Sequence, residues 1–495
     1  MRVFRVFLLS AISVSCVTTS SAQKMVSSPA ISLDSKQIES IDSFVTTEMA
    51  HQKIPGVAVG IYSRGRILLA KGYGQANVEL SVPVKAETVF QSGSVGKQFV
   101  SAAIMMLVEE GKLSLDDSIA KYFPDAPEAW KPILIKNLLS HTSGLSEYES
   151  PDRTGVNGPF YLRLDFTEDE LFNKIKALPI EWAPGDRWAY RNTNYLLLGI
   201  LIHKITGKPY AAFLDERIFK PLGMTSTRLI SDRDIILNRA SGYEIDKGEL
   251  KNQAWVSSTF NSTADGALYF NVLDLAKWDN ALYGTGLLKQ SSLDSIWTVY
   301  PLNNGRPNPA GYGFAWEIDK QNGHKRIAHG GAWQGFTCNI SRYPDDNLTV
   351  AVLTNLGSGH SDPDMMAHAI AGLADAALLP AKLTAIPDTQ PEIASRLAKV
   401  LDQLMAGEDI TAQASPKLAS RITPEIRRQA QQSFADLWPG GTLALIKRMP
   451  LPDTADQVGS VFSLSKGEKA VLIIFAVDPD GKFSTFRLLP DREYE

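Results

Sequence analysis

Ser94 is followed three residues later by Lys97, in the run Ser94-Val95-Gly96-Lys97. A serine hydroxyl is a weak nucleophile and needs a neighbouring base. Residues three apart share a helix face, so the Lys97 amine can reach the Ser94 hydroxyl if a helix begins here. Burial and the positive end of the helix both disfavour charged lysine, which lowers its pKa. The pair predicts nucleophilic catalysis, and the alternative is a helix cap followed by a surface lysine.

The sequence after Ser94 predicts the buried helix that this chemistry requires. Apolar residues lie on nearly every side of the segment 97–110, and Gly111 follows as a stop signal. The first N–H groups of such a helix also point at an incoming oxyanion. Upstream, the β-rich runs 56–62 and 66–71 predict a hairpin that turns at Arg64-Gly65.

The remaining elements predict an α+β domain over residues 33–380. Residues 130–290 are mainly helical in pattern, and Thr167-x-x-Glu170 is a capping box. Strands are expected at 313–318, 325–328, 336–342 and 348–353, and a closing helix at 365–379. Strands at both ends with helices between them imply one antiparallel sheet, flanked by helices, with an inserted helical lobe.

A second, smaller α+β domain is predicted over residues 391–495, after a linker at 381–390. Its helices are expected near 391–406 and 424–437, and its strands near 442–449, 460–465, 469–477 and 483–489. The segment contains no histidine and no cysteine. It offers no nucleophile–base pair, so we expect an accessory role such as a dimer or partner contact.

Four segments of the larger domain are informative together: Phe90-Gln-Ser-Gly-Ser-Val-Gly-Lys-Gln-Phe99, Leu138-Leu-Ser-His-Thr-Ser-Gly-Leu145, Pro184-Gly-Asp-Arg-Trp-Ala-Tyr-Arg-Asn192 and His329-Gly-Gly331. In order and spacing they resemble the motifs of the serine β-lactamase and penicillin-binding-protein superfamily, particularly its class C-like branch. The third contains the family's Tyr-x-Asn motif, and the fourth stands where Lys-Thr-Gly is usual. The resemblance implies the β-lactamase/transpeptidase-like fold and does not extend past residue 380.

The resemblance also implies a role for each matching residue. Ser94 would be the acylated nucleophile, with Lys97 as its partner in proton transfer and Tyr190 as a second proton carrier. Tyr190 acts as a base only if nearby cations lower its pKa from ~10, so the choice of main base stays open. The substrate-binding residues would be Asn192, His329, Gly331 and Ala332, with the N–H groups of Ser94 and Ala332 forming the oxyanion hole.

His329 departs from the family pattern and limits the substrate prediction. A lysine there would face a substrate carboxylate, whereas a histidine with an ordinary pKa of ~6.5 is mostly neutral at pH 7 and becomes a cation on mild acidification. We therefore expect an esterase or a peptidase/amidase acting on a small-molecule or peptide acyl substrate. The alternatives are a β-lactamase or D-Ala-D-Ala carboxypeptidase, and a non-catalytic protein that binds peptidoglycan or a partner. Arg191 either adds a cation near the cleft or is solvated, and Trp333 either lines the site or packs in the core.

Other function classes receive little support. The 495 residues carry 50 basic and 54 acidic side chains, a balance that gives no electrostatic case for binding nucleic acid. His360, Asp362, Asp364 and His368 have metal-ligand residue types, but Asp362-Pro363 is more typical of a helix start. No metal or organic cofactor is expected.

The first 22 residues predict export. Arg2 and Arg5 precede an apolar stretch that ends near Val17, and small residues lead up to Ala22. We expect a signal peptide cleaved after Ala22 and a periplasmic or secreted product, with lipid attachment at Cys16 as the weaker alternative. The apolar stretch is too short for a membrane span, which needs ~20 residues.

Overall fold

The computed structural model describes residues 31–149, 160–379, 385–451, 458–467 and 469–489. The predicted signal peptide with Cys16, and part of the predicted linker, lie outside these residues. Within them, no helix combines the length and apolar character needed to cross a membrane.

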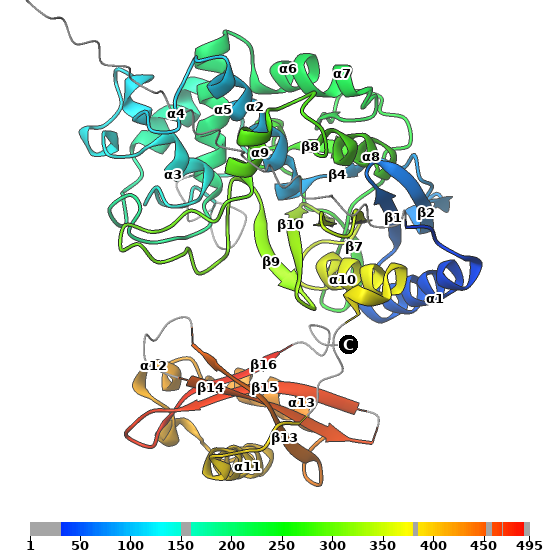
Figure 1. Cartoon of the computed structure of the whole chain (residues 1–495), viewed down its shortest axis with the longest axis vertical. Helices are drawn as coiled ribbons and strands as arrows, with labels where there is room; N and C mark the ends of the chain where they lie inside the picture. The colour runs from blue at the N-terminus through cyan, green and yellow to red at the C-terminus, as the bar shows by residue number, and fades with distance from the viewer. Residues whose placement is uncertain (1–30, 150–159, 380–384, 452–457, 468, 490–495) are drawn as a thin grey trace, which may run out of the picture.

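A seven-stranded antiparallel sheet forms the centre of the larger domain (Figure 1). Its strand order is β3-β2-β1-β12-β11-β10-β9. The bounds are β1 Gly56–Ser63, β2 Arg66–Asn77, β3 Val82–Pro83, β9 Glu317–Gln321, β10 His324–Trp333, β11 Phe336–Tyr343 and β12 Leu348–Thr354. Because β1 pairs with β12, strands from the two ends of the domain build one sheet. The predicted fold class and the predicted β1–β2 hairpin are confirmed.

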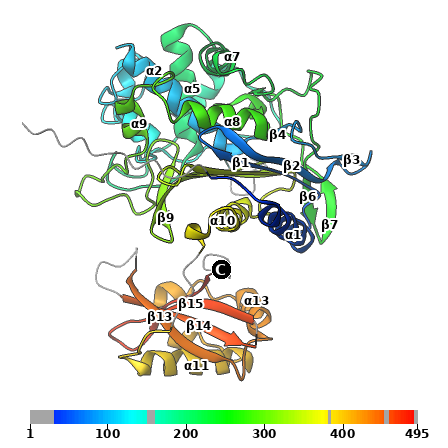
Figure 2. The ribbon, with the colours of Figure 1, turned by 45° about the vertical axis from the view of Figure 1, so that its right-hand side comes forward.

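Helices cover both faces of this sheet (Figure 2). Successive side chains of a strand point to opposite faces, and β1 divides accordingly. Val57, Val59 and Ile61 pack with α1 (Ser35–Gln52) and α10 (Pro363–Ala374), whereas Ala58 and Tyr62 belong to the core of the helical lobe. Burial on both faces explains why the whole of β1 is buried.

The helical lobe holds the buried helix that the sequence predicts, α2 (Lys97–Glu109). Gly111 follows it with a φ of +68°, in the left-handed region that favours glycine. The other helices of the lobe and its border are α3 Ile135–Leu139, α4 Glu168–Lys176, α5 Asn192–Thr206, α6 Tyr210–Leu214, α7 Lys220–Leu222, α8 Val272–Ala281 and α9 Gln290–Ile296. Thr167 and Glu170 form the predicted capping box of α4.

Two small sheets accompany these helices and were not predicted. The strands are β4 Phe90–Gln91, β8 Leu268–Phe270 and β5 Arg228–Leu229 in one sheet, and β6 Tyr243–Asp246 with β7 Glu249–Asn252 in the other. All five strands are two to four residues long, too short for a period-two pattern to stand out.

The strand predicted at 313–318 is wrong in its first half, because β9 begins only at Glu317. The preceding residues form a turn, in which Gly313 N–H donates to the Trp316 carbonyl at 2.8 Å and Ala315 has a φ of +63°. Phe314 and Trp316 are buried in this turn. Their apolar side chains resemble a strand in sequence, but they fill the core without pairing.

The C-terminal unit is a four-stranded antiparallel sheet with helices, as predicted (Figure 1). Its elements are α11 Pro391–Met405, α12 Pro416–Ala419, α13 Pro424–Phe434, β13 Thr442–Pro450, β14 Val458–Lys466, β15 Lys469–Val477 and β16 Phe483–Leu489. Residues from α11 and from all four strands form a hydrophobic core of their own, with Leu397, Phe462 and Phe475 fully or almost fully buried.

Candidate active site

Ser94 lies in a 3-10 turn, Gly93–Gly96, that leads directly into α2. This turn touches β10 at a distance that only glycine permits. A Cβ on Gly93, whose φ is +45°, would lie 2.4 Å from the Ala332 nitrogen, and a Cβ on Gly331 would lie 2.2 Å from the Ser92 carbonyl oxygen. The two glycines therefore bring the backbone of Ser94 and that of Ala332 to one place. β9 pairs with β10 only from His324 to Ala328, so at this contact β10 is paired with β11 on one side and not with β9 on the other.

The Lys97 side chain is completely buried and reaches three oxygen atoms. Its Nζ lies 2.8 Å from Ser94 Oγ and 2.8 Å from Asn192 Oδ1, and it donates to the backbone carbonyl of Asp265. Burial lowers the pKa of Lys97 to about 8, while the negative charges of Asp265, Glu149 and Glu147 oppose that shift. A substantial fraction of this lysine is therefore neutral in a mildly basic solution.

The three contacts suit a neutral lysine as well as a charged one. The Asp265 carbonyl can only accept, and Asn192 presents its amide oxygen, so two N–H bonds of a neutral amine are used there. The remaining position on Nζ is a lone pair that faces Ser94 Oγ. In that state the Ser94 hydroxyl donates to Lys97, which is the arrangement of a nucleophile and its general base.

Tyr190 lies beside the pair, with its ring centroid 4.9 Å from Lys97 Nζ. Burial raises the pKa of Tyr190 well above 10, and its contact with Ser94 only partly offsets this. The shift is opposite in direction to the one that a tyrosinate base would need. The protonated phenol can instead donate or relay a proton near Ser94 Oγ.

His329 is 3% exposed and held by two hydrogen bonds. Its Nδ1 lies 2.5 Å from the Gly330 carbonyl and its Nε2 lies 2.8 Å from the Tyr312 hydroxyl. A carbonyl only accepts, so Nδ1 carries the proton and Nε2 accepts from Tyr312. Burial and the charge of Lys97 lower the pKa of His329 to about 3. The imidazole is neutral at pH 7, but the expectation that mild acidification makes it a cation is wrong, because the side chain is desolvated.

Several residues for which the sequence predicts no catalytic or binding role hold this arrangement together. The Glu147 carboxylate accepts from the Asn192 N–H at 2.7 Å and so fixes the start of α5. His141 packs against Tyr190 with ring centroids 4.3 Å apart and ring planes tilted by 38°, and its Nδ1 lies 3.1 Å from Asn194 Nδ2. Glu147 and Asp265 come from loops 118 positions apart, so no spacing in the sequence could connect them.

A cavity of about 500 Å³ opens onto Ser94. Its walls include Tyr190, Asn192, His329, Gly331, Ala332 and Trp333, so every predicted site residue except the buried Lys97 lines it. Trp333 also donates from Nε1 to Asn261 Oδ1 at 2.9 Å. Among the described residues that line this cavity, the acids are Glu149, Asp265, Glu317 and Asp364, and there is no lysine or arginine.

Arg191 does not add a cation to that wall. Its Nη2 lies 2.7 Å from Glu181 Oε2, and its guanidinium carbon lies 5.6 Å from the centre of the Trp182 ring. Arg191, inside the Tyr-x-Asn motif, is thus ion-paired with Glu181 outside the cavity lining.

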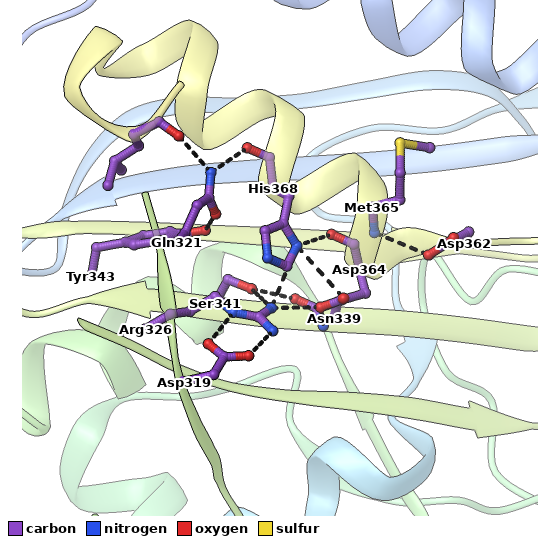
Figure 3. Close-up of polar contacts among 11 residues, drawn as sticks. Asp319, Gln321, Arg326, Asn339, Ser341, Tyr343, Asp362, Asp364, Met365 and His368 are labelled. Atoms are coloured by element: carbon purple, nitrogen blue, oxygen red, sulfur yellow. Dashed lines mark hydrogen bonds and ion pairs between the residues drawn. The ribbon is translucent and has the colours of Figure 1, made fainter. Parts of the chain in front are cut away.

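The residues with metal-ligand types near α10 have structural roles (Figure 3). Asp362 caps α10 by accepting from the Met365 N–H at 3.0 Å, as its sequence predicts. Asp364 accepts from Arg326 Nη1 and from Asn339 Nδ2, both at 2.7 Å, which ties α10 to β10 and β11. The described part of the chain holds no group of three or more side chains placed to bind a metal ion.

Residues 41–375 match the protein family described as Beta-lactamase. Penicillin-binding protein 4* of Bacillus subtilis is 30% identical over 311 residues, which cover 59% of this chain and 66% of that protein. A D-aminopeptidase of Brucella anthropi is 27% identical over 325 residues, 66% of this chain and 61% of that protein. The matches thus span about two thirds of the length of these relatives. The octameric penicillin-binding protein homologue of Pyrococcus abyssi shares the fold, with a TM-score of 0.60 at 24% identity over 92% of this chain and all of that chain.

Proposed function

Because the chain belongs to the Beta-lactamase family, we propose that it is a serine hydrolase that forms an acyl-enzyme on Ser94. The observation that carries this proposal is the contact of 2.8 Å between Ser94 Oγ and a fully buried lysine amine whose pKa is lowered to about 8. A lysine on the surface would stay charged at neutral pH and could not accept the serine proton.

In the acylation step, Ser94 Oγ attacks the substrate carbonyl and its proton passes to Lys97 Nζ. The developing oxyanion receives hydrogen bonds from the backbone N–H groups of Ser94 and Ala332, which the glycines of the turn and β10 bring together. The proton then passes to the leaving amine or alcohol, through Tyr190 or directly from Lys97, as the bond to the carbonyl carbon breaks. Asn192 orients both the Lys97 amine and the substrate amide or acyl group.

In the deacylation step, a water molecule attacks the Ser94 ester. Lys97, neutral again after the leaving group has taken its proton, accepts a proton from that water. Lys97 then returns that proton to Ser94 Oγ as the bond between Oγ and the acyl carbon breaks, which releases the carboxylic acid and restores the Ser94 hydroxyl. Tyr190, protonated throughout, serves as the second proton carrier, so we assign Lys97 as the main base.

The substrates we propose are esters or amides without a carboxylate next to the scissile bond. His329 is a neutral group where the family usually has a lysine, and the charged side chains on the described cavity wall are all acidic. A substrate carboxylate would be repelled there, which disfavours β-lactams and D-Ala-D-Ala peptides. The likeness to a D-aminopeptidase supports an amidase or peptidase within this class.

The protein is proposed to be exported, with residues 1–22 as a signal peptide that is removed. Residues 33–380 would form the hydrolase domain. Residues 391–495 are proposed to be the accessory domain. The C-terminal unit has a hydrophobic core of its own, and we propose that this domain makes a dimer or partner contact. A protein that only binds its ligand would not need Ser94, Tyr190 and Asn192 on one cavity wall with the Lys97 amine in contact with Ser94. This arrangement supports a hydrolase over a purely binding protein.

Labelling with a fluorophosphonate probe, followed by peptide mapping, tests the proposal. Wild-type protein should be labelled on Ser94, and Ser94→Ala should abolish labelling and turnover while the fold is kept. Ser101→Ala is the matched control, because Ser101 is also buried on α2 but has Ile104 instead of a lysine three residues later. Labelling that persists in Ser94→Ala, or its loss in the folded control, contradicts the assignment. Penicillin in a parallel incubation should label Ser94 poorly.

A further inference from the structure

Asp265 is a buried carboxylate on the wall of the cavity with one oxygen unpaired. Its side chain is 6% exposed. Oδ2 accepts a hydrogen bond of 2.8 Å from the Tyr148 hydroxyl, whereas Oδ1 has no hydrogen-bond partner among the described residues. An unsatisfied buried acceptor destabilises the fold. A donor supplied by the substrate would remove that cost.

The charges around Asp265 indicate what kind of donor fits. Asp265, Glu149 and Glu147 all act on Lys97 and raise its pKa. When Lys97 is neutral and able to accept the Ser94 proton, these carboxylates lose their nearest positive charge. A cation brought by the substrate would replace it, and would also favour the neutral form of Lys97 by cancelling part of the negative field.

We propose that Asp265, together with Glu149 on the same wall, binds a primary ammonium group on the acyl part of the substrate. The inference rests on the proposed function, since it describes the acyl group that Ser94 receives. The backbone carbonyl of Asp265 and the side chain of Asn192 contact the same Lys97 amine, and both residues line the same cavity. An ammonium at the Asp265 carboxylate therefore lies near the acyl group that Asn192 is proposed to bind. The substrate class is therefore aminoacyl amides and esters, with the amine a few bonds from the scissile carbonyl.

The test compares two substrates that differ in one group. Alanine p-nitroanilide carries the ammonium, and lactic acid p-nitroanilide has a neutral hydroxyl in its place; both enantiomers of each are assayed at pH 6.5. We expect kcat/KM to be about ten- to hundredfold higher for the amine, the range expected for a hydrogen bond to a charged group. The ratio should fall above the pKa of a free α-amino group, ~8.

Variants locate the effect. Asp265→Asn keeps the size of the side chain and an oxygen for Tyr148, and it should reduce the amine-to-hydroxyl ratio to near one. The ratio is measured within each variant, so a general loss of rate cancels. Glu317→Gln is the matched control, because Glu317 is another acid of the same cavity wall that does not act on Lys97. It should keep the ratio of the wild type.

The outcomes separate this inference from the proposed function. Equal kcat/KM values for the two anilides, or a ratio that survives in Asp265→Asn, overturn the ammonium site even if Ser94 is labelled and turns over. Should the enzyme hydrolyse neither anilide, protection of Ser94 against the fluorophosphonate is compared for alaninamide and lactamide. Stronger protection by alaninamide supports the inference, and equal protection overturns it. Absence of any Ser94 labelling contradicts the proposed function itself.

Discussion

The rate of Ser94 acylation should follow the neutral fraction of Lys97. With a pKa of about 8, about one tenth of the lysine is neutral at pH 7 and about nine tenths at pH 9. The rate should therefore rise about tenfold per pH unit below pH 7 and level off above pH 9. An ordinary lysine, with a pKa near 10.4, would still show a rising rate at pH 10.

Asp265→Asn should move this midpoint to lower pH. The Asp265 carboxylate is the largest of the charges that raise the pKa of Lys97, so its removal lowers that pKa. A charge at this range changes a pKa by about one unit, which would make the neutral fraction at pH 6 about tenfold larger. The variant should thus be labelled faster than wild type in acid and at the same rate above pH 9.

The assay is the second-order rate of fluorophosphonate labelling between pH 5 and 10, because this probe is uncharged and the readout does not depend on turnover. Glu317→Gln serves as the control. Partial desolvation in the cavity raises the pKa of Glu317 to about 7, so its titration is the main competing source of an inflection. A wild-type midpoint near 10.4, a midpoint that disappears in Glu317→Gln, or an unchanged midpoint in Asp265→Asn would refute the assignment of Lys97 as the base.

Three further predictions concern His329, the buried ion pair and the accessory domain. In Glu317→Gln protein, which lacks the wall carboxylate whose pKa is about 7, the preference for neutral over carboxylate-bearing substrates should stay constant from pH 7 to 5, since the pKa of His329 is about 3; His329→Lys should narrow that preference about tenfold at pH 7, and steady-state kinetics on a matched pair of substrates at each pH would reveal any other result. Arg342→Met should lower the free energy of unfolding by about 3–5 kcal/mol, because it leaves the fully buried carboxylate of Asp279 without its partner at 2.9 Å; a denaturant midpoint equal to that of wild type would contradict this. A chain that ends near residue 382 should still be labelled on Ser94, because the C-terminal unit has its own core; folded but unlabelled protein, judged by circular dichroism, would show that the accessory domain completes the site.

Acidification should also weaken the fold through two buried histidines. Burial holds the pKa of His141 and that of His329 well below 6.5, so the unfolded chain binds protons that the folded chain does not. Their contribution to stability is complete above pH 6.5 and is lost as the pH falls below that value, by about 1.4 kcal/mol per pH unit for each histidine. Guanidinium unfolding at pH 6.5 and 5 measures the loss, and His329→Gln should make it smaller.

The local part of the site could be read from the sequence because it is encoded within single elements. Ser94 and Lys97 are one helical turn apart, and Tyr190 and Asn192 flank the start of α5. The contacts of 2.8 Å from Lys97 to Ser94 and to Asn192 follow from two buried helices that the apolar runs predicted correctly. The prediction of a strand at 313–318 is largely wrong because it relies on apolar residues alone. Phe314 and Trp316 are buried in a turn that precedes β9, and burial alone does not distinguish a strand from a packed turn.

The electrostatic part of the site could not be predicted, because it depends on which loops fold over Lys97. No motif marks Glu147 or Asp265, although their charges decide how far burial can lower the lysine pKa. The same is true of His329, whose residue type suggested a switch near pH 6.5 but whose burial removes it. Burial and nearby charge thus act in the same direction on the pKa of His329 and in opposite directions on the pKa of Lys97. Burial lowers the pKa of both His329 and Lys97, and the surrounding acids oppose that shift only at Lys97. The pKa of Lys97 therefore stays close enough to neutral pH for the amine to exchange a proton with Ser94 in both steps of the proposed reaction.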